Sequence, residues 1–139
     1  MKNRIAKQIG FTVVFILVFS STHLFAQSED KDVWKAPVEA DQLINPLKGN
    51  ADAVKAGKKL YKQQCAICHG DTGKGDGVGG MSLNPKPTNF RSERVQKESD
   101  GALFWKITNG NAPMASYKEI LSEEQRWQLV NYIRTFSKK

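Results

Sequence analysis

The chain is poor in residues that crosslink a fold or bind metal, with two cysteines and two histidines among its 139 residues. A structural zinc site uses four Cys or His ligands, and only three are clustered here, in residues 65–69. A disulfide between Cys65 and Cys68 would close too small a loop to add much stability. A fold held together by zinc or by disulfides is therefore not favoured.

Long apolar runs, alternating runs and phosphate-binding signatures are also missing. The longest apolar stretch, residues 9–19, is shorter than the roughly 20 residues that a membrane-spanning helix needs. No run alternates apolar and polar residues for long enough to predict a strand. The glycine-rich segment 70–80 lacks the Gly-Lys-Ser/Thr ending of a phosphate loop. These absences favour an all-α protein in which the glycines form a tight loop.

The positive charge is concentrated at the N-terminus. The formal charge is +7, and Lys2, Arg4 and Lys7 lie in the first 26 residues, which contain no acidic residue. Without these three the balance is 18 basic to 14 acidic residues, or +4. That mild excess does not predict a nucleic-acid-binding protein.

Residues 1–26 resemble a secretory signal peptide, with a basic start and the apolar stretch 9–19. Cleavage is expected near Ala26, before Gln27, although Leu24 is larger than the residue usually preferred at such a site. An uncleaved membrane anchor is the alternative. The prediction is export to the periplasm, with the mature protein peripheral to the membrane at most.

The exported part is expected to consist of a polar arm, residues 27–50, and a domain, residues 51–139. The arm is polar, and Pro37 and Pro46 break any long helix in it. We expect it to be extended and anchored along the domain by Trp34, with a disordered tail as the alternative.

Three helices are predicted in the domain. The first spans residues 51–64 with Asn50 as its cap, and an apolar stripe of Ala51, Ala53, Ala56 and Leu60. The second spans residues 99–108 and begins at Ser99, and the third begins at Ser122 in a Ser-x-x-Gln capping box. The predicted fold class is all-α.

The string Cys65-Ala66-Ile67-Cys68-His69 carries the chemistry. Cys-x-x-Cys-His is the attachment signature of a c-type haem. Two thiols at this spacing bond covalently to the porphyrin, and the adjacent His69 becomes the proximal iron ligand. A thioredoxin-like dithiol would need a neighbouring βαβ pattern, which is absent. The predicted cofactor is one covalent haem c, with Cys65, Cys68 and His69 binding it.

With this motif after the first helix and Pro113-Met114 before the last, the chain resembles the class I c-type cytochromes over residues 51–137. It is similar to small bacterial single-haem domains related to the cytochrome c subunits of haem-copper oxidases, including the segments 73–77 and 85–87. The resemblance implies three main helices around one haem.

The resemblance also implies how the first and last helices cross. In the family, a Gly and an aromatic residue of the first helix pack against a Leu and a Tyr of the last helix. These positions correspond here to Gly57 and Tyr61, and to Leu129 and Tyr132. A close approach of this kind would explain a glycine inside a helix, where it costs about 1 kcal/mol relative to Ala.

The second axial ligand is expected to be Met114. If His23 is removed with the signal peptide, Met81 and Met114 remain as possible thioether ligands. Met81 follows a flexible glycine run, whereas Pro113 makes the Met114 loop rigid, and the family places its distal Met there. The resemblance further implies that a proline carbonyl accepts the ring N–H of His69, which leaves Pro85 and Pro87 as candidates.

The expected function is transfer of one electron between respiratory redox partners, without enzyme activity. Filled axial positions leave the iron no site for substrate, so transfer would be outer-sphere. The expected partner is a membrane oxidase or dehydrogenase. The protein itself is expected to be a monomer. Exposed lysines near the haem, among them Lys74, Lys86 and Lys118, would steer an acidic partner. The alternatives are a haem c subunit of a larger oxidase or dehydrogenase and, less favoured, a gas sensor.

Overall fold

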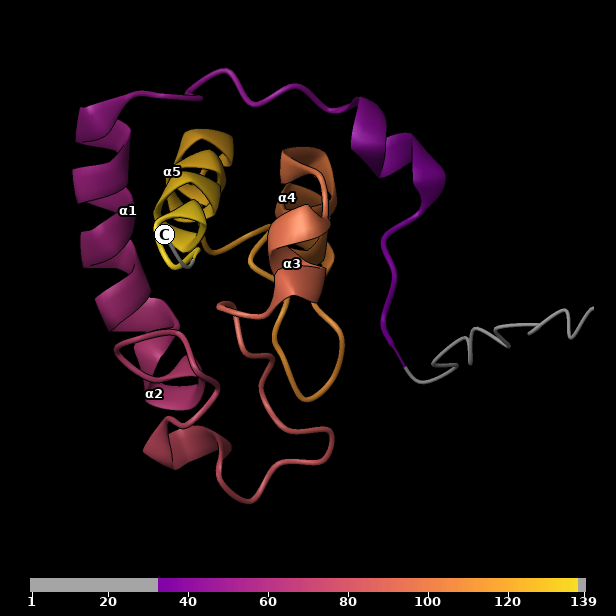
Figure 1. Ribbon diagram of the computed structural model, residues 1–139, viewed down its shortest axis with the longest axis vertical. Helices are drawn as coiled ribbons and strands as arrows, with labels where there is room; N and C mark the ends of the chain where they lie inside the picture. Colours follow the sequence, from indigo (N-terminus) through magenta and orange to yellow (C-terminus); the bar gives the residue numbers. More distant parts are fainter. Residues whose placement is uncertain (1–32, 138–139) are drawn as a thin grey trace, which may run out of the picture. The chain divides into compact units, whose positions relative to one another are not determined.

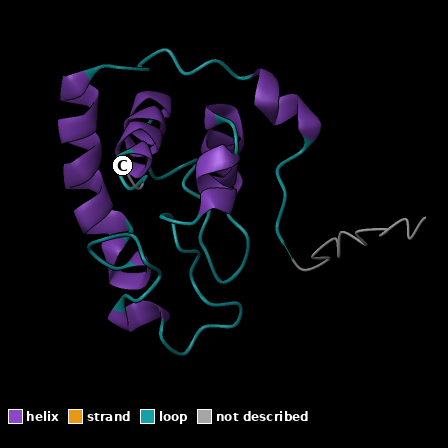
Figure 2. Ribbon diagram, in the orientation of Figure 1, coloured by secondary structure: helices purple, strands orange, loops and turns teal. Residues whose placement is uncertain are grey.

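The computed structural model describes residues 33–137, which belong to one compact unit. The described residues form helices and no strand, and their single β-bridge pairs Asn111 with Met114 (Figures 1 and 2). The predicted all-α class is confirmed. The predicted signal peptide, residues 1–26, lies outside the described residues.

Helix α1 spans Ala51–Gln64, as predicted. The Asn50 side chain caps it by accepting hydrogen bonds from the backbone N–H groups of Asp52 and Ala53, at 2.9 and 3.0 Å. Its buried residues are Ala53, Gly57 and Tyr61. Ala51, which was expected in the apolar stripe, is exposed, because the buried face is centred on Gly57 instead.

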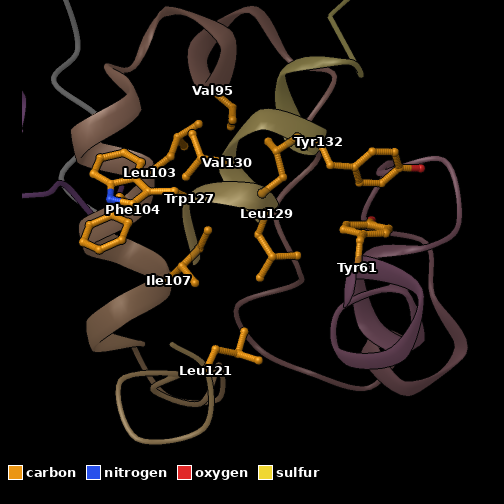
Figure 3. Packing of buried hydrophobic residues seen from close by; sticks show 11 residues of the cluster. Tyr61, Val95, Leu103, Phe104, Ile107, Leu121, Trp127, Leu129, Val130 and Tyr132 are labelled. Carbon is orange, nitrogen blue, oxygen red and sulfur yellow. The ribbon is translucent and has the colours of Figure 1, made fainter. Parts of the chain in front are cut away.

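Helix α1 packs against α5 (Glu123–Arg134), and Gly57 makes that approach possible. A Cβ atom on Gly57 would collide with the backbone carbonyl of Gln128 and lie 3.1 Å from the Cβ of Tyr132. The rings of Tyr61 and Tyr132 lie 5.2 Å apart beside this crossing (Figure 3). Gly57, Tyr61 and Tyr132 therefore occupy the contact that the family resemblance implied.

Helix α4 (Asp100–Asn109) completes the core with α5. The predicted caps are present: Ser99 accepts from the N–H of Ala102, and Ser122 and Gln125 form a complete capping box. Figure 3 shows the side chains that these helices bury together. The cluster consists of Tyr61, Val95, Leu103, Phe104, Ile107, Leu121, Trp127, Leu129, Val130, Tyr132 and Ile133.

Two short helices were not predicted. Helix α2 (Ala66–His69) lies within the haem motif, and α3 (Glu93–Lys97) is capped by Ser92. With four and five residues, neither is long enough to show a helical period in the sequence. The 3-10 turn η2 (Val78–Gly80) lies in the glycine-rich loop.

Residues 33–50 of the expected arm are docked on the helices. Trp34 packs on Trp105 with ring centroids 6.1 Å apart, and the Lys106 ammonium lies over the Trp34 ring. The segment also contains a 3-10 helix, η1 (Val38–Gln42), which contacts α4. Trp34 is thus an anchor, as expected, although part of the segment is helical.

A buried polar contact also holds this segment in place. The amide nitrogen of Asn45 donates to Asn131 on α5 at 2.7 Å and to Asp100 at 3.0 Å. Since Asn45 is only 7% exposed, these bonds replace its lost contacts with water. None of the helices described is both long and apolar enough to cross a membrane.

Candidate haem site

The two cysteines of the motif lie on one helical turn. Cys65 ends α1, and Cys68 and His69 lie in α2. The backbone N–H groups of Cys68 and His69 both donate to the Cys65 carbonyl, at 3.1 and 2.9 Å. Residues three apart on a helix share a face, so this turn places both thiols on one side. Both thiols are free and half-buried.

Before haem is attached, the thiol of Cys65 is protonated at neutral pH. Burial, followed by the neighbouring Cys68, raises the pKa of Cys65 to about 12. The motif therefore presents at least one neutral thiol, held in place by the end of α1.

The imidazole of His69 is oriented by a backbone carbonyl. Its Nδ1 lies 3.0 Å from the carbonyl oxygen of Thr88. A carbonyl only accepts, so Nδ1 carries the proton and Nε2 keeps the lone pair that can bind a metal. Burial lowers the pKa of His69, and the Thr88 bond opposes this only in part. The ring is thus neutral, as a metal ligand must be.

The expectation that Pro85 or Pro87 accepts this N–H is wrong. The acceptor is Thr88, the residue after the second proline. The Pro87 carbonyl faces Gly75, where a Cβ atom would collide with it. Successive carbonyls of an extended segment point in opposite directions, so the next one faces the imidazole.

Phe90 completes the support of His69. Its ring stacks on the imidazole at 4.3 Å with an interplanar angle of 16°. It also packs edge-on against Tyr61, at 6.2 Å. The sequence analysis missed both Thr88 and Phe90, and the only signal was an aromatic residue at the end of the proline segment. Their roles depend on how residues 85–90 fold back over the motif.

The glycine-rich segment forms a tight loop, as predicted, but it folds back on the haem motif where the sequence predicted that it bends away from the haem ligand. The N–H groups of Gly75 and Gly77 donate to the carbonyls of His69 and Cys68, at 2.8 and 3.1 Å. Gly70 has a φ of +75°, which favours glycine, and its carbonyl accepts a 2.7 Å hydrogen bond from the buried Tyr61 hydroxyl. The loop thus satisfies backbone carbonyls of the motif.

Met114 lies in the loop between α4 and α5. Asn111 and Met114 exchange two backbone hydrogen bonds, of 3.0 and 2.9 Å, which close a tight turn. Met114 is half-buried, whereas Met81 is 67% exposed at the end of η2. The loop reaches the end of α1, next to the haem motif, through Tyr117, whose hydroxyl donates to the Gln64 carbonyl at 2.9 Å.

The donor set fits a covalently attached haem. Two free thiols share a turn with a neutral histidine whose Nε2 is available, and a thioether lies in a separate ordered loop. Within residues 33–137, no group of three or more His, Cys, Asp or Glu could hold a metal ion by itself. Fold and site together define a c-type cytochrome.

The comparisons with known proteins give the family. Residues 52–133, more than half of the chain, match the family model described as cytochrome c oxidase, cbb3-type, subunit III. The chain belongs to this family. The predicted recognition as a c-type cytochrome is confirmed, and its cofactor is covalent haem c with iron.

The similar proteins include a dehydrogenase, a chain of a protein complex and a c-type cytochrome. A thiosulfate dehydrogenase of Stutzerimonas stutzeri is 52% identical over 49 residues, which are 35% of this chain and 16% of that protein. A chain of the Kuenenia stuttgartiensis reducing HAO-like protein complex is 29% identical, with a TM-score of 0.60, over 67% of this chain and 47% of that one. The KustC0563 c-type cytochrome is 34% identical, with a TM-score of 0.51, over 59% of this chain and 98% of that one.

Proposed function

We propose that the protein is an exported single-haem electron carrier in which Cys65 and Cys68 form the thioethers and His69 and Met114 are the axial ligands. The observation that carries the proposal is the bond from His69 Nδ1 to the Thr88 carbonyl, beside two free thiols. It leaves Nε2 as the only ring nitrogen able to bind iron. When bound, the haem supplies a one-electron iron couple.

The surroundings of Met114 support it as the distal ligand. Met114 is partly buried, yet it is not among the partly buried residues of 33–137 that pack on the hydrophobic core. A methionine that only filled the core would pack there. Met81, by contrast, is mostly exposed to solvent. His/Met ligation raises the reduction potential relative to two histidines.

The residues around the motif orient the imidazole of His69 and pack against it. Phe90 and the Thr88 carbonyl fix the imidazole plane, and Tyr61 closes the space behind it. With both axial ligands supplied by the chain, no position remains for a substrate, so the proposed role is transport of electrons and not an enzyme reaction.

The proposed organisation follows the expectations from the sequence. Residues 1–26 direct export and are cleaved near Ala26, residues 27–50 form an arm, and residues 51–139 form the cytochrome domain in the periplasm. The docking of Trp34 and Asn45 supports an arm that belongs to the folded unit. The proposed mature protein is a monomer that meets a membrane oxidase or dehydrogenase.

Absorption spectra of the purified protein, oxidised and reduced, test this proposal. We expect the spectrum of covalent haem c and, in the oxidised form, a Met–iron charge-transfer band. Met114→Ala should abolish the band and Met81→Ala, the matched control, should retain it. The opposite pattern would assign the distal ligand to Met81.

A second candidate is a haem c subunit of a larger oxidase or dehydrogenase. The similarity to the thiosulfate dehydrogenase and to the chain of the HAO-like protein complex favours this candidate. This chain spans less than half of each of those proteins, and the second belongs to a complex. Affinity purification from the native membrane distinguishes the two. Stoichiometric recovery of a catalytic subunit would support this candidate, and a monomer free in the periplasmic fraction would support the carrier.

A further inference from the structure

The loop between α4 and α5 turns two side chains inward. Of residues 111–118, Met114 and Tyr117 are partly buried and the others are exposed. Tyr117 packs against the hydrophobic core of the described residues. The proposed iron ligand and an anchored aromatic residue are thus three positions apart on one short loop.

Most hydrogen bonds between this loop and the rest of the chain run to the neighbouring helices α4 and α5. The backbone N–H of Tyr117 donates to the Ile107 carbonyl at 3.1 Å, and the Ser116 hydroxyl donates to the Thr108 carbonyl at 2.7 Å. The guanidinium of Arg126 donates to the Lys118 carbonyl at 3.0 Å. These bonds tie the loop to α4 and α5 but not to the helices that carry the haem motif.

One hydrogen bond joins the loop to the end of α1, next to the haem motif. The Tyr117 hydroxyl donates to the carbonyl of Gln64 at 2.9 Å. Among the residues described, it is the only hydrogen bond that joins the loop 110–121 to residues 51–92. Gln64 is the last residue of α1 and directly precedes Cys65.

The acceptor is well suited to this role. The last carbonyls of an α-helix have no partner within the helix, so the Gln64 carbonyl is available. The neighbouring N–H of Cys65 bonds within α1, to Tyr61. The Tyr117 bond therefore uses a free helix end next to the first haem-binding thiol.

We propose that Tyr117 is a positioning residue that closes the Met114 loop over the haem motif through its bond to Gln64. The inference rests on the proposed function, since it takes Met114 as the distal ligand. Without the bond, the loop would keep its contacts with α4 and α5 but would move more freely relative to His69. The sulfur of Met114 would then be displaced more easily from its axial position.

Tyr117→Phe in the haem-loaded protein tests the proposal, because it keeps the packed ring and removes only the hydroxyl. Carbon monoxide competes with a methionine ligand on reduced haem, so its affinity reports how firmly Met114 is held. A single hydrogen bond contributes little net free energy, so we expect about a twofold to tenfold gain in carbon monoxide affinity. The Met–iron band of the oxidised form should also disappear at lower denaturant concentration, while helix content stays unchanged.

Ser116→Ala is the matched control. It deletes a hydroxyl bond of similar length in the same loop, but that bond runs to α4 and does not cross to α1. We expect wild-type affinity for carbon monoxide in this variant. Equal affinity in Tyr117→Phe and wild type, or equal gains in both variants, would overturn the positioning role.

Met114→Ala separates this inference from the proposed function. If the Met–iron band survives in Met114→Ala, the distal ligand itself is wrongly assigned and both proposals fall. If Met114→Ala loses the band while Tyr117→Phe binds carbon monoxide as the wild type does, only the role of Tyr117 fails. Loss of the band in Met114→Ala with tighter carbon monoxide binding in Tyr117→Phe alone supports both.

Discussion

Gly57 of α1 lies directly against the backbone carbonyl of Gln128 in α5, with no room for a Cβ atom. Helix α1 ends at Cys65 of the haem motif, and helix α5 supplies five of the eleven core residues. The two helices therefore meet at a backbone-to-backbone contact. A side chain at position 57 would push the axes apart, because a carbonyl within a helix cannot rotate away.

Gly57→Ala is expected to lower the free energy of unfolding by about 1–3 kcal/mol, the usual cost of overpacking. The loss should appear although Ala favours a helix by about 1 kcal/mol relative to Gly. Denaturant unfolding of the haem-loaded protein measures it. Lys59→Ala, on the exposed side of the same helix, is the control and should change stability by less than about 0.5 kcal/mol. A stabilised Gly57→Ala would contradict the close crossing.

Tyr61→Phe is expected to destabilise the protein by about 0.5–1.5 kcal/mol, the net contribution of one hydrogen bond. The Tyr61 side chain is fully buried, and its hydroxyl donates to the Gly70 carbonyl at 2.7 Å. Removing the donor deletes this buried hydrogen bond, while the Gly70 carbonyl still accepts from the N–H of Gly73 at 3.1 Å. Tyr132→Phe is the comparison, since no hydrogen bond of the Tyr132 hydroxyl is found within residues 33–137. Thermal unfolding of the two variants should differ, and equal effects would count against the Gly70 bond.

Asp100→Asn is expected to cost about 1.5–3 kcal/mol at neutral pH, because charge-assisted hydrogen bonds are lost. Asp100 accepts from Arg134 at 2.7 Å and from Asn45 at 3.0 Å. Burial alone would raise the pKa of Asp100, but the bonds from Asn45 and Arg134 outweigh it and lower the pKa.

The effect of Asp100 should depend on pH in one direction. A carboxylate with a lowered pKa contributes its full stability above the unfolded value, about 3.9, and loses it as the pH falls through the lower folded value. Unfolding curves of wild type and Asp100→Asn should therefore differ at pH 7 and converge in acid below about pH 4. A difference that grows in acid would contradict this pairing.

Trp34→Ala is expected to release the segment that precedes α1. The indole packs on Trp105 and lies 5.6 Å below the Lys106 ammonium, so its loss should cost about 1–2 kcal/mol. Limited proteolysis should then cut within residues 33–50 sooner than in the wild type. Val38→Ala is the control, since Val38 is 76% exposed. Equal cleavage of all three proteins would argue against anchoring by Trp34.

Electron transfer to an acidic partner is expected to slow steeply as salt is added. Lys74, Lys86 and Lys118 are exposed and lie in the loops around the motif, whereas Lys55 already pairs with Asp52 at 3.0 Å. Stopped-flow rates between about 10 and 200 mM salt measure the effect, since screening shortens the range of the attraction. Lys74→Gln should flatten the salt dependence more than Lys55→Gln. A rate indifferent to salt would exclude electrostatic steering.

The helices and the haem motif could be predicted because their signals are local. The caps at Asn50, Ser99 and Ser122 satisfy N–H groups within three residues along the chain, so they are visible in the sequence. The spacing of Cys65, Cys68 and His69 is equally local. These features led to the all-α class and the c-type cytochrome family, both of which are confirmed.

The partners of those residues depended on contacts between distant segments. The acceptor of the His69 N–H is 19 residues away. The family resemblance implied a proline carbonyl, whereas the acceptor is the carbonyl of Thr88. Which carbonyl of an extended segment faces a given ring depends on how that segment twists and packs. Here the Pro87 carbonyl faces Gly75, and the carbonyl of Thr88 is the one that faces the imidazole of His69.

The sequence by itself determined the cofactor chemistry, because covalent attachment requires two thiols and a histidine at one local spacing. Only the tertiary structure decided what holds those groups: Phe90 on the imidazole, the Thr88 carbonyl at its Nδ1, and Tyr117 across the loop. Each of these contacts joins residues that are far apart in the chain. Their geometry is set by the packing of whole helices, which no short pattern encodes.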